Sequence, residues 1–418
     1  MKTVDLIKLF YSILSPRAKL EAKSVERMGL LAIKIAQMYA VRSDLLPPEK
    51  CLELCRFLQN TTPLRHEEFI ERWRAVVPPS FERICSSFDP APIASASLGQ
   101  VHRACLRDGR QVAVKISRSE QRNKFLADVR AAKRLLRLAL AFYPKLARLA
   151  DPLGALATVE RQTLLEMDFR AEQSGAARLA ELAAESSAAL PHLASLQFPA
   201  YFPELSNRNF LVSEYVEGHT IAEWLQHGEL PYEVLLDLFR IQGFFLFVQG
   251  EFHGDLHPGN VIWRDNRFWF LDNANVETVP QTFARGLLQM LVCLGQEDIE
   301  AAGNQLAELS TTPLPNSARK EFIAGFNQLY RGFCGQTVAE KSLTRQMMET
   351  VNLAVRHGIE FPLGAFPLIK SLMYLDGMVL RCNPRAVLLR DVAKFADDFP
   401  PISTRGAAQP VARISVAV

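Results

Sequence analysis

The sequence predicts an α+β fold with two lobes and an N-terminal helical extension, because helical and strand-like patterns follow one another in blocks. Residues 1–78 place apolar side chains at helical spacing. Between residues 79 and 217, short β-like runs alternate with turns and with inserted helices. Residues 218–398 are mostly helical around one predicted hairpin, and residues 399–418 are poor in large apolar residues. We therefore expect an extension, a small lobe with a mixed sheet, a helical lobe and a disordered tail, with these boundaries.

Composition is typical of a globular protein, with 49% apolar and 22% charged residues among 418. The net charge of +3 is too small to indicate a nucleic-acid partner. Seven cysteines without a repeated spacing predict reduced thiols in a cytosol-like compartment. No apolar run reaches the roughly 18–20 residues of a membrane helix, so we expect a cytoplasmic protein without a transmembrane segment. The first helix is predicted to dock on the protein itself, and peripheral membrane contact is the alternative.

The extension contains a predicted helix over Val25–Tyr39, in which Lys34 and Gln37 lie one turn apart. Pro47–Pro48 then breaks the helical pattern, and a further helix is predicted over Glu49–Gln59. Composition alone makes Lys34 a solvated helix lysine.

Two strands of the small lobe flank a loop of small residues. The loop leads into a β-like run from Val101, and a second strand ends in V-A-V-K at Lys115. The protein-kinase phosphate loop has the pattern G-x-G-x-x-G-x-V and is followed by a V-A-I-K strand. Small residues let the backbone approach phosphates, and the lysine supplies a positive charge. Two alanines at glycine positions predict a stiffer loop. The predicted nucleotide loop consists of Ala94, Ser95, Ala96, Ser97, Gly99 and Val101.

Residues 118–190 are predicted to be helical and include three acidic residues of interest. A kinase requires a helix glutamate that pairs with the strand lysine, and either Glu172 or Glu166 could reach Lys115. Glu166 and Asp168 cannot both face the same side of a regular helix. A solvated acidic face is the alternative interpretation.

Two further strands are predicted over Phe198–Phe202 and Phe210–Tyr215, and residues 216–218 are predicted to form a hinge between the lobes. We expect Glu214, Tyr215 and Val216, where the second strand meets this hinge, to contact the nucleotide.

The stretch His253–Asp272 reads as a loop, a strand, a tight turn, a second strand and a carboxylate. Asp255 and Asn260 fit the kinase signature H-x-D-x-x-x-x-N, and Asp272 falls at the position of the D-F-G aspartate. In magnesium-dependent phosphoryl transfer, such an aspartate orients the acceptor, and an asparagine and a second aspartate bind the metal. We therefore predict Asp255 as catalytic, with Asn260 and Asp272 as Mg²⁺ ligands. A polar surface loop before an ordinary hairpin is the alternative.

The order of these motifs closely resembles the UbiB/AarF family of atypical protein-kinase-like proteins over roughly residues 20–390. The matching segments are residues 34–37 with 42–48, the alanine-rich loop 92–104, the acidic segment 166–172, the loop 253–260 with Asp272, and the C-terminal motifs 356–362 and 376–384.

The resemblance implies a two-lobed protein-kinase-like fold with the helical extension over the active site. Lys34 matches the family's K-x-G-Q lysine, and Glu166 and Asp168 match its E-x-D acids. The resemblance therefore implies that Lys34 contacts both acids and obstructs protein substrates, which leaves Glu172 to pair with Lys115. Lys34, Gln37, Glu166 and Asp168 are thus expected to be regulatory, and Lys115, Glu172 and Asp255 catalytic.

The resemblance also implies ATP or ADP with Mg²⁺ as cofactors, and a role in ubiquinone or other isoprenoid-lipid metabolism. The expected partner is an adenine nucleotide, and contact with a lipid or quinone precursor and peripheral contact with a membrane are further alternatives. The sequence departs from the family at Ala36, which replaces a glycine, and at Asn273-Ala274, which replaces Phe-Gly after the metal aspartate.

We expect a magnesium-dependent atypical kinase or ATPase. HGDLHPGN also resembles the catalytic loop of aminoglycoside and choline phosphotransferases, so a small-molecule kinase is one alternative. A non-catalytic module that binds nucleotide is the other.

Overall fold

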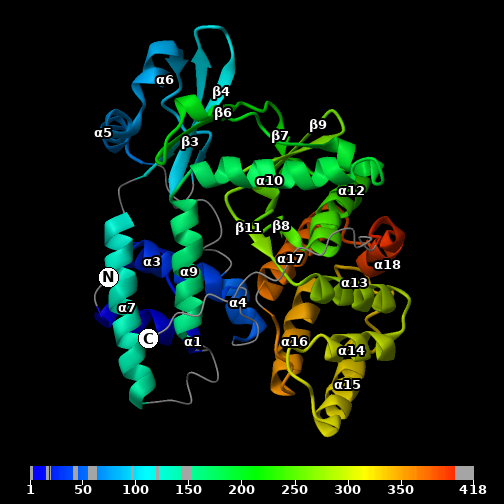
Figure 1. The fold of residues 1–418 in the computed structure, drawn as a ribbon. Coiled ribbons are helices and arrows are strands. Elements are labelled where there is room, and N and C mark those ends of the chain that lie inside the picture. Colours follow the sequence, from blue (N-terminus) through cyan, green and yellow to red (C-terminus); the bar gives the residue numbers. More distant parts are fainter. Residues whose placement is uncertain are drawn as a thin grey trace.

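A computed structural model gives the fold and describes residues 3–15, 18, 20–40, 46–54, 64–95, 98–118, 122–142, 152–362 and 364–400. A strand-rich lobe and a larger helical lobe meet near helix α10 (Arg170–Ser186), and a group of helices lies beside both (Figure 1). The predicted two-lobed α+β fold is confirmed. None of the helices in the described part of the chain combines the length and apolarity needed to cross a bilayer.

The helices beside the lobes combine the N-terminal extension with two helices from the middle of the chain (Figure 1). They are α1 (Thr3–Leu14), α2 (Ala22–Met28), α3 (Leu30–Tyr39), α4 (Pro48–Leu54), α7 (Arg122–Phe142) and α9 (Pro152–Glu166). Their buried side chains form one apolar cluster that also includes Met348 of α16 (Leu343–Arg356) in the helical lobe. The helix predicted over Val25–Tyr39 is divided at Gly29, whose φ of 100° interrupts it.

The small lobe contains an antiparallel sheet in the order β1-β3-β4-β6, with β2 also paired to β3. Its elements are α5 (His66–Val76), α6 (Pro79–Ile84), β1 (Cys85–Phe88), β2 (Ala94–Ser95), β3 (Gly99–Leu106), β4 (Gln111–Ser117) and β6 (Phe210–Glu214). Along β4, Val112, Val114 and Ile116 are buried in the core of this lobe. Because side chains alternate along a strand, Lys115 points to the opposite face, toward the site described below.

The strand predicted over Phe198–Phe202 is wrong. The chain forms β5 at Leu196–Gln197, which pairs in parallel with β10 (Arg267–Phe270) of the helical lobe. Within the predicted stretch, Tyr201 forms an isolated bridge to Ser213, and backbone hydrogen bonds join Ala200 and Phe202 to β6 without forming a continuous strand. Pro199 lies inside this stretch and lacks the N–H that a continuous ladder requires.

The helical lobe surrounds the predicted catalytic hairpin. Its strands are β7 (His219–Thr220), β8 (Glu251–His253), β9 (Val261–Arg264), β10 and β11 (Val276–Thr278). Its helices are α11 (Ile221–His227), α12 (Tyr232–Gly243), which continues as a π-helical turn to Gln249, α13 (Gln281–Gly295), α14 (Ile299–Glu308), α15 (Asn316–Tyr330), α16, α17 (Ala365–Cys382) and α18 (Leu388–Ala393). The turn between β9 and β10 has positive φ at Asp265 and Asn266, as a two-residue hairpin requires.

The predicted tail begins too early, because Phe399 is only 2% exposed. Its ring contacts Phe239 and Phe247, with centroid separations of 5.9 and 5.7 Å. A Cβ at Gly243 would lie 2.5 Å from the ring of Phe399, so this glycine makes room for it. Residues 401–418 of the predicted tail lie outside the described residues.

Truncating this anchor in Phe399→Ala should lower the free energy of unfolding by about 3 kcal/mol, since a buried aromatic side chain is lost. Urea denaturation measures the change. Leu380→Ala is the matched control because Leu380 is 41% exposed, and it should stay within about 0.5 kcal/mol of the wild type. Equal stability of both variants would contradict the anchoring role.

His102 of β3 is fully buried and held as a neutral imidazole. The side-chain oxygen of Gln100 accepts from the Leu64 N–H (3.0 Å), so its amide nitrogen donates to Nε2 of His102 (2.9 Å). Nδ1 of His102 then donates to the carbonyl oxygen of Asp89 (2.9 Å). Burial lowers the pKa of His102 because it disfavours the charged ring, and this outweighs the hydrogen bond to the Asp89 carbonyl, which acts in the opposite direction.

This site should make the fold sensitive to acid. The folded-state pKa of His102 is below the unfolded value of about 6.5, so its contribution is present above that pH and is lost as the pH falls further. We expect urea unfolding to show less loss of stability between about pH 7.5 and about pH 5.5 in His102→Gln than in the wild type. Parallel losses in the two proteins would show that other groups cause the acid sensitivity.

Candidate active site

The loop predicted to contact phosphates lies where β2 turns into β3. Ala94 pairs with Val101 in the sheet, and the hydroxyl of Ser95 accepts a hydrogen bond from Arg118 (2.6 Å). A Cβ at Gly99 would lie 2.9 Å from the carbonyl oxygen of Ile116, so only glycine fits without displacement. The other two predicted loop residues, Ala96 and Ser97, lie outside the described residues.

Lys115 is the centre of the candidate site. Its Nζ lies 2.8 Å from Oε2 of Glu172 on α10 and 2.8 Å from Oδ1 of Asp272, which follows β10. Burial alone lowers the pKa of Lys115, but the charges of Asp272 and Glu172 outweigh it and raise the pKa on balance. Tyr201 donates to the other oxygen of Glu172 (3.4 Å). The lysine therefore stays protonated and bridges the two lobes.

Close packing holds α10 against the segment that carries Asp272. A Cβ at Gly175 would lie only 1.8 Å from the backbone oxygen of Asn273, so the helix and this segment approach at a distance that no other residue permits. Asp272 has a φ of 51°, a conformation that is uncommon for residues other than glycine. Asn273 is fully buried, and its side chain donates to the carbonyl of Phe270 (2.9 Å). The Asn-Ala departure at this point thus forms a packed, hydrogen-bonded turn.

The catalytic-loop motif is held together by His253, which is fully buried. Its Nδ1 accepts from the backbone N–H of Asp255 (3.1 Å), so its Nε2 donates to the carbonyl of Leu271 (3.0 Å). The side-chain nitrogen of Asn260 donates to the backbone carbonyl of Asp255 (3.1 Å). These bonds fix the loop beside the end of β10 and bring Asp255, Asn260 and Asp272 to one place.

The carboxylate of Asp255 binds two groups that sequence reasoning missed. Oδ1 of Asp255 accepts from Nζ of Lys370 (2.8 Å) and from the hydroxyl of Tyr374 (3.0 Å), both on α17. These residues lie 115 and 119 positions from Asp255 in the chain. Their i, i+4 spacing on a predicted helix was the only local signal, and such spacing is common on solvated helices.

Lys34 of the extension contacts Glu166 at the end of α9, as expected. The predicted contact of Lys34 with Asp168 is wrong. Asp168 instead forms ion pairs with Arg170 (2.7 Å) and Arg208 (3.3 Å), and the bonds from Arg170 hold its pKa at about 2. The α9 helix ends at Glu166, so the two acidic side chains leave the chain in different directions. Gln37 lies half-buried one turn after Lys34 on α3.

The predicted nucleotide-contacting segment at the lobe junction follows β6. Glu214 pairs with Val112 of β4, and the backbone N–H of Tyr215 donates to the Gln111 carbonyl (3.2 Å). The Arg103 guanidinium lies over the Tyr215 ring, 4.6 Å from its centroid. The third predicted residue, Val216, is half-buried and directly follows them.

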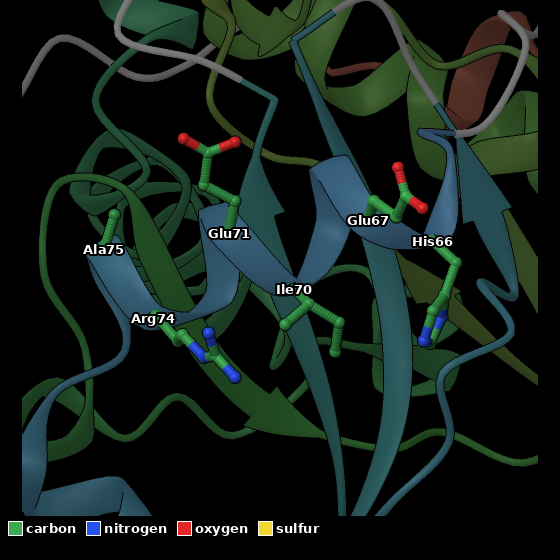
Figure 2. A pocket seen from close by; sticks show the side chains of 6 residues that line it. All are labelled: His66, Glu67, Ile70, Glu71, Arg74 and Ala75. Carbon is green, nitrogen blue, oxygen red and sulfur yellow. The ribbon is translucent and has the colours of Figure 1, made fainter.

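An open hollow over α5 is a less suitable binding site (Figure 2). The carboxylates of Glu67 and Glu71 point to one side of the helix, whereas His66, Ile70 and Arg74 point to the other, as Figure 2 shows. Polar groups that orient a ligand have to converge on it. The site around Lys115 meets this requirement and the hollow over α5 does not.

Comparisons with known proteins find similar sequences among kinase-like proteins. The sequence profile of the ABC1 atypical kinase-like domain matches residues 57–306. The probable protein kinase UbiB of Vibrio parahaemolyticus is 25% identical over 386 residues, which cover 90% of this chain and 69% of the relative. The uncharacterized protein in the hydrogenase 1 5′ region of Clostridium pasteurianum is 25% identical over 376 residues, covering 87% and 67%.

A solved structure shows the same fold. Rv3197 from Mycobacterium tuberculosis, determined in complex with erythromycin, has a TM-score of 0.54 to this chain at 18% identity. The match covers 95% of each chain. At this identity the likeness supports the fold alone.

The packing at Gly175 generates a test of the site's assembly. Gly175→Ala should move α10 away from Asn273 and weaken the Lys115–Glu172 pair, with a loss of about 1–3 kcal/mol in unfolding free energy. Gly377→Ala in α17 is the matched control, because a Cβ there meets nothing within 4 Å and alanine favours a helix. Thermal unfolding measures both, and a Gly175→Ala protein as stable as the control would contradict the packing argument.

Proposed function

The chain belongs to the ABC1 atypical kinase-like family, and on that basis we propose that it is a nucleotide-dependent atypical kinase or ATPase of the UbiB type that uses ATP or ADP with Mg²⁺. The observation that carries the proposal is the cluster in which Lys115, Glu172 and Asp272 meet beside the Asp255 loop. Phosphoryl transfer depends on positioning and charge stabilisation, which such a cluster supplies.

The chain's own residues divide this work. Lys115, fixed by Glu172, directs its positive charge at nucleotide phosphates, and the loop Ala94–Val101 lets the backbone approach them. Residues 214–216 contact the adenine nucleotide where the lobes join. Asp255 orients the acceptor oxygen and takes its proton.

The residues near Asp255 fit a magnesium ion. The side-chain nitrogen of Asn260 is bonded to Asp255, which leaves its oxygen as a ligand atom, and Asp272 uses one carboxylate oxygen for Lys115. Hard cations such as Mg²⁺ are bound through one or two such oxygens together with substrate phosphates. Bound there, the ion would neutralise charge on the phosphates.

The helical extension is the proposed regulatory part. The ion pair of Lys34 and Glu166 links α3 to the end of α9. The Lys34 side chain is 11% exposed and the Glu166 side chain 30% exposed, so the pair is partly shielded from water. Gln37 follows Lys34 on α3, and Asp168 follows Glu166 in the chain. Together these four residues are proposed to restrict the access of protein substrates to the site. We keep the division into residues 1–78, 79–217 and 218–398 for the extension, the small lobe and the helical lobe, except that α5 (His66–Val76) packs in the core of the small lobe and belongs to it.

The relatives' name, UbiB, supports a role in ubiquinone or other isoprenoid-lipid metabolism. A lipid or quinone precursor is the partner that this role implies. For this role, the protein would be located in the cytoplasm, in peripheral contact with a membrane surface.

A thermal-shift titration with ATP and ADP, with and without Mg²⁺, tests the proposal. Nucleotide at about 100 times its Kd should stabilise the wild type by about 2.7 kcal/mol. This shift should require Mg²⁺ and be lost in Asp272→Ala, while Asp265→Ala, which removes an exposed aspartate of the hairpin turn, should retain it. Lys115→Met should lower nucleotide turnover about 10²-fold or more.

Wild-type protein that neither binds nor hydrolyses nucleotide would refute the proposal. A phosphorylated small metabolite among the products would favour a small-molecule kinase instead. Equal turnover in the wild type and Asp255→Asn would favour a non-catalytic nucleotide-binding module.

A further inference from the structure

The described site contains a second, partly buried lysine that the proposed mechanism does not use. Lys370 is 17% exposed, and its Nζ lies 2.8 Å from Oδ1 of Asp255. It projects from α17, more than a hundred residues from the loop that carries Asp255. The Asp255 side chain is 39% exposed, so this ion pair borders the open part of the site.

The structure of α17 fixes where this lysine can act. Leu368, Ile369 and Leu372 are buried in the core of the helical lobe, which anchors the helix. Lys370 and Tyr374 are one turn apart on the helix and both bond the same oxygen of Asp255. The Nζ of Lys370 also lies 5.5 Å from the centre of the Tyr374 ring. A rigid helix therefore presents one positive charge beside Asp255, the residue proposed to orient the phosphoryl acceptor.

The ion pairs of the two lysines in the site differ, and this difference suggests a role for Lys370. Lys115 already serves Glu172 and Asp272, whereas Lys370 pairs with Asp255 alone among the ion pairs of the described residues. In the transfer step, the acceptor oxygen bonds to phosphorus as the bond to the ADP oxygen breaks, and the acceptor's proton passes to Asp255. The terminal phosphoryl group must then lie next to Asp255. A lysine within hydrogen-bond distance of Asp255 is within reach of the same phosphoryl oxygens.

We propose that Lys370 is a further catalytic residue, which binds the terminal phosphoryl group of ATP, and that Tyr374 is a positioning residue for Asp255. This inference rests on the proposed nucleotide-dependent function. Lys115 then serves the phosphates from the small lobe, and Lys370 serves the transferred group from the helical lobe. The contact distinguishes ATP from ADP, because ADP lacks the group that Lys370 binds.

Isothermal titration calorimetry with Mg-ATP and with Mg-ADP tests the proposal. Lys370→Met should weaken ATP binding about tenfold or more and change ADP binding less than about threefold, since a charged hydrogen bond to one phosphoryl group is lost. Lys370→Gln, which can still donate to Asp255 but carries no charge, should show the same selective loss. Lys370→Arg should restore ATP binding to within about threefold of the wild type.

Two controls separate this role from a structural one. Lys394→Met removes a lysine that directly follows α18, is 65% exposed and also lies 2.8 Å from an aspartate, Asp391, and it should leave both affinities unchanged. Tyr374→Phe should keep the preference for ATP over ADP. Equal weakening of ATP and ADP, or no change, in both Lys370→Met and Lys370→Gln would overturn the inference and leave the proposed function standing. A wild type that binds neither nucleotide would overturn both.

Discussion

One ammonium group, that of Lys115, is the point on which the arrangement of the lobes depends. It is 15% exposed and bonds a carboxylate from α10 and a carboxylate that follows β10, each at 2.8 Å. Glu172 is 11% exposed, and leaving such a buried charge without its partner costs about 3–5 kcal/mol, which favours its contact with Lys115. Asp272 is 44% exposed, so water screens its contact with Lys115 more strongly. The sheet of the small lobe, α10 and the catalytic hairpin are thereby fixed relative to one another.

Backbone packing reinforces this electrostatic constraint. Gly175 allows α10 to contact the backbone of Asn273, and Asp272 adopts a positive φ immediately before it. Buried Asn273 anchors the turn through a hydrogen bond to Phe270. The departure from Phe-Gly therefore does not remove Asp272 from the site. An amide hydrogen bond and a glycine on the facing helix define this turn.

A second lysine–glutamate pair connects the extension to the rest of the molecule. Lys34 reaches Glu166, and the apolar cluster around α3, α7 and α9 includes Met348 of the helical lobe. Ala36, where the family has glycine, is fully buried in that cluster, so its methyl group is part of the packing. The extension thus shares a core with both the middle helices and the helical lobe.

For the partner of Lys115, the residue pattern left Glu166 and Glu172 open, and the family resemblance selected Glu172. The fold class and the hairpin that follows the Asp255 motif were predictable from the sequence alone. These follow from local patterns: alternation along strands, a two-residue turn, and motif residues at fixed spacing. Phe198–Phe202 was misread because its apolar pattern resembles a strand, although Pro199 interrupts the ladder. The predicted contact of Asp168 with Lys34 is wrong, because the fold pairs Asp168 with arginines at positions 170 and 208.

The distant groups that complete the site are set by the packing of the helices and cannot be found in the sequence. Lys370 and Tyr374 reach Asp255 because α17 packs beside the catalytic loop, and Phe399 belongs to the core because Gly243 leaves space for its ring. Such contacts join residues more than a hundred positions apart and carry no local pattern. Motif spacing reports on groups held by one stretch of backbone, whereas charge pairing and close packing between helices depend on how those stretches come together.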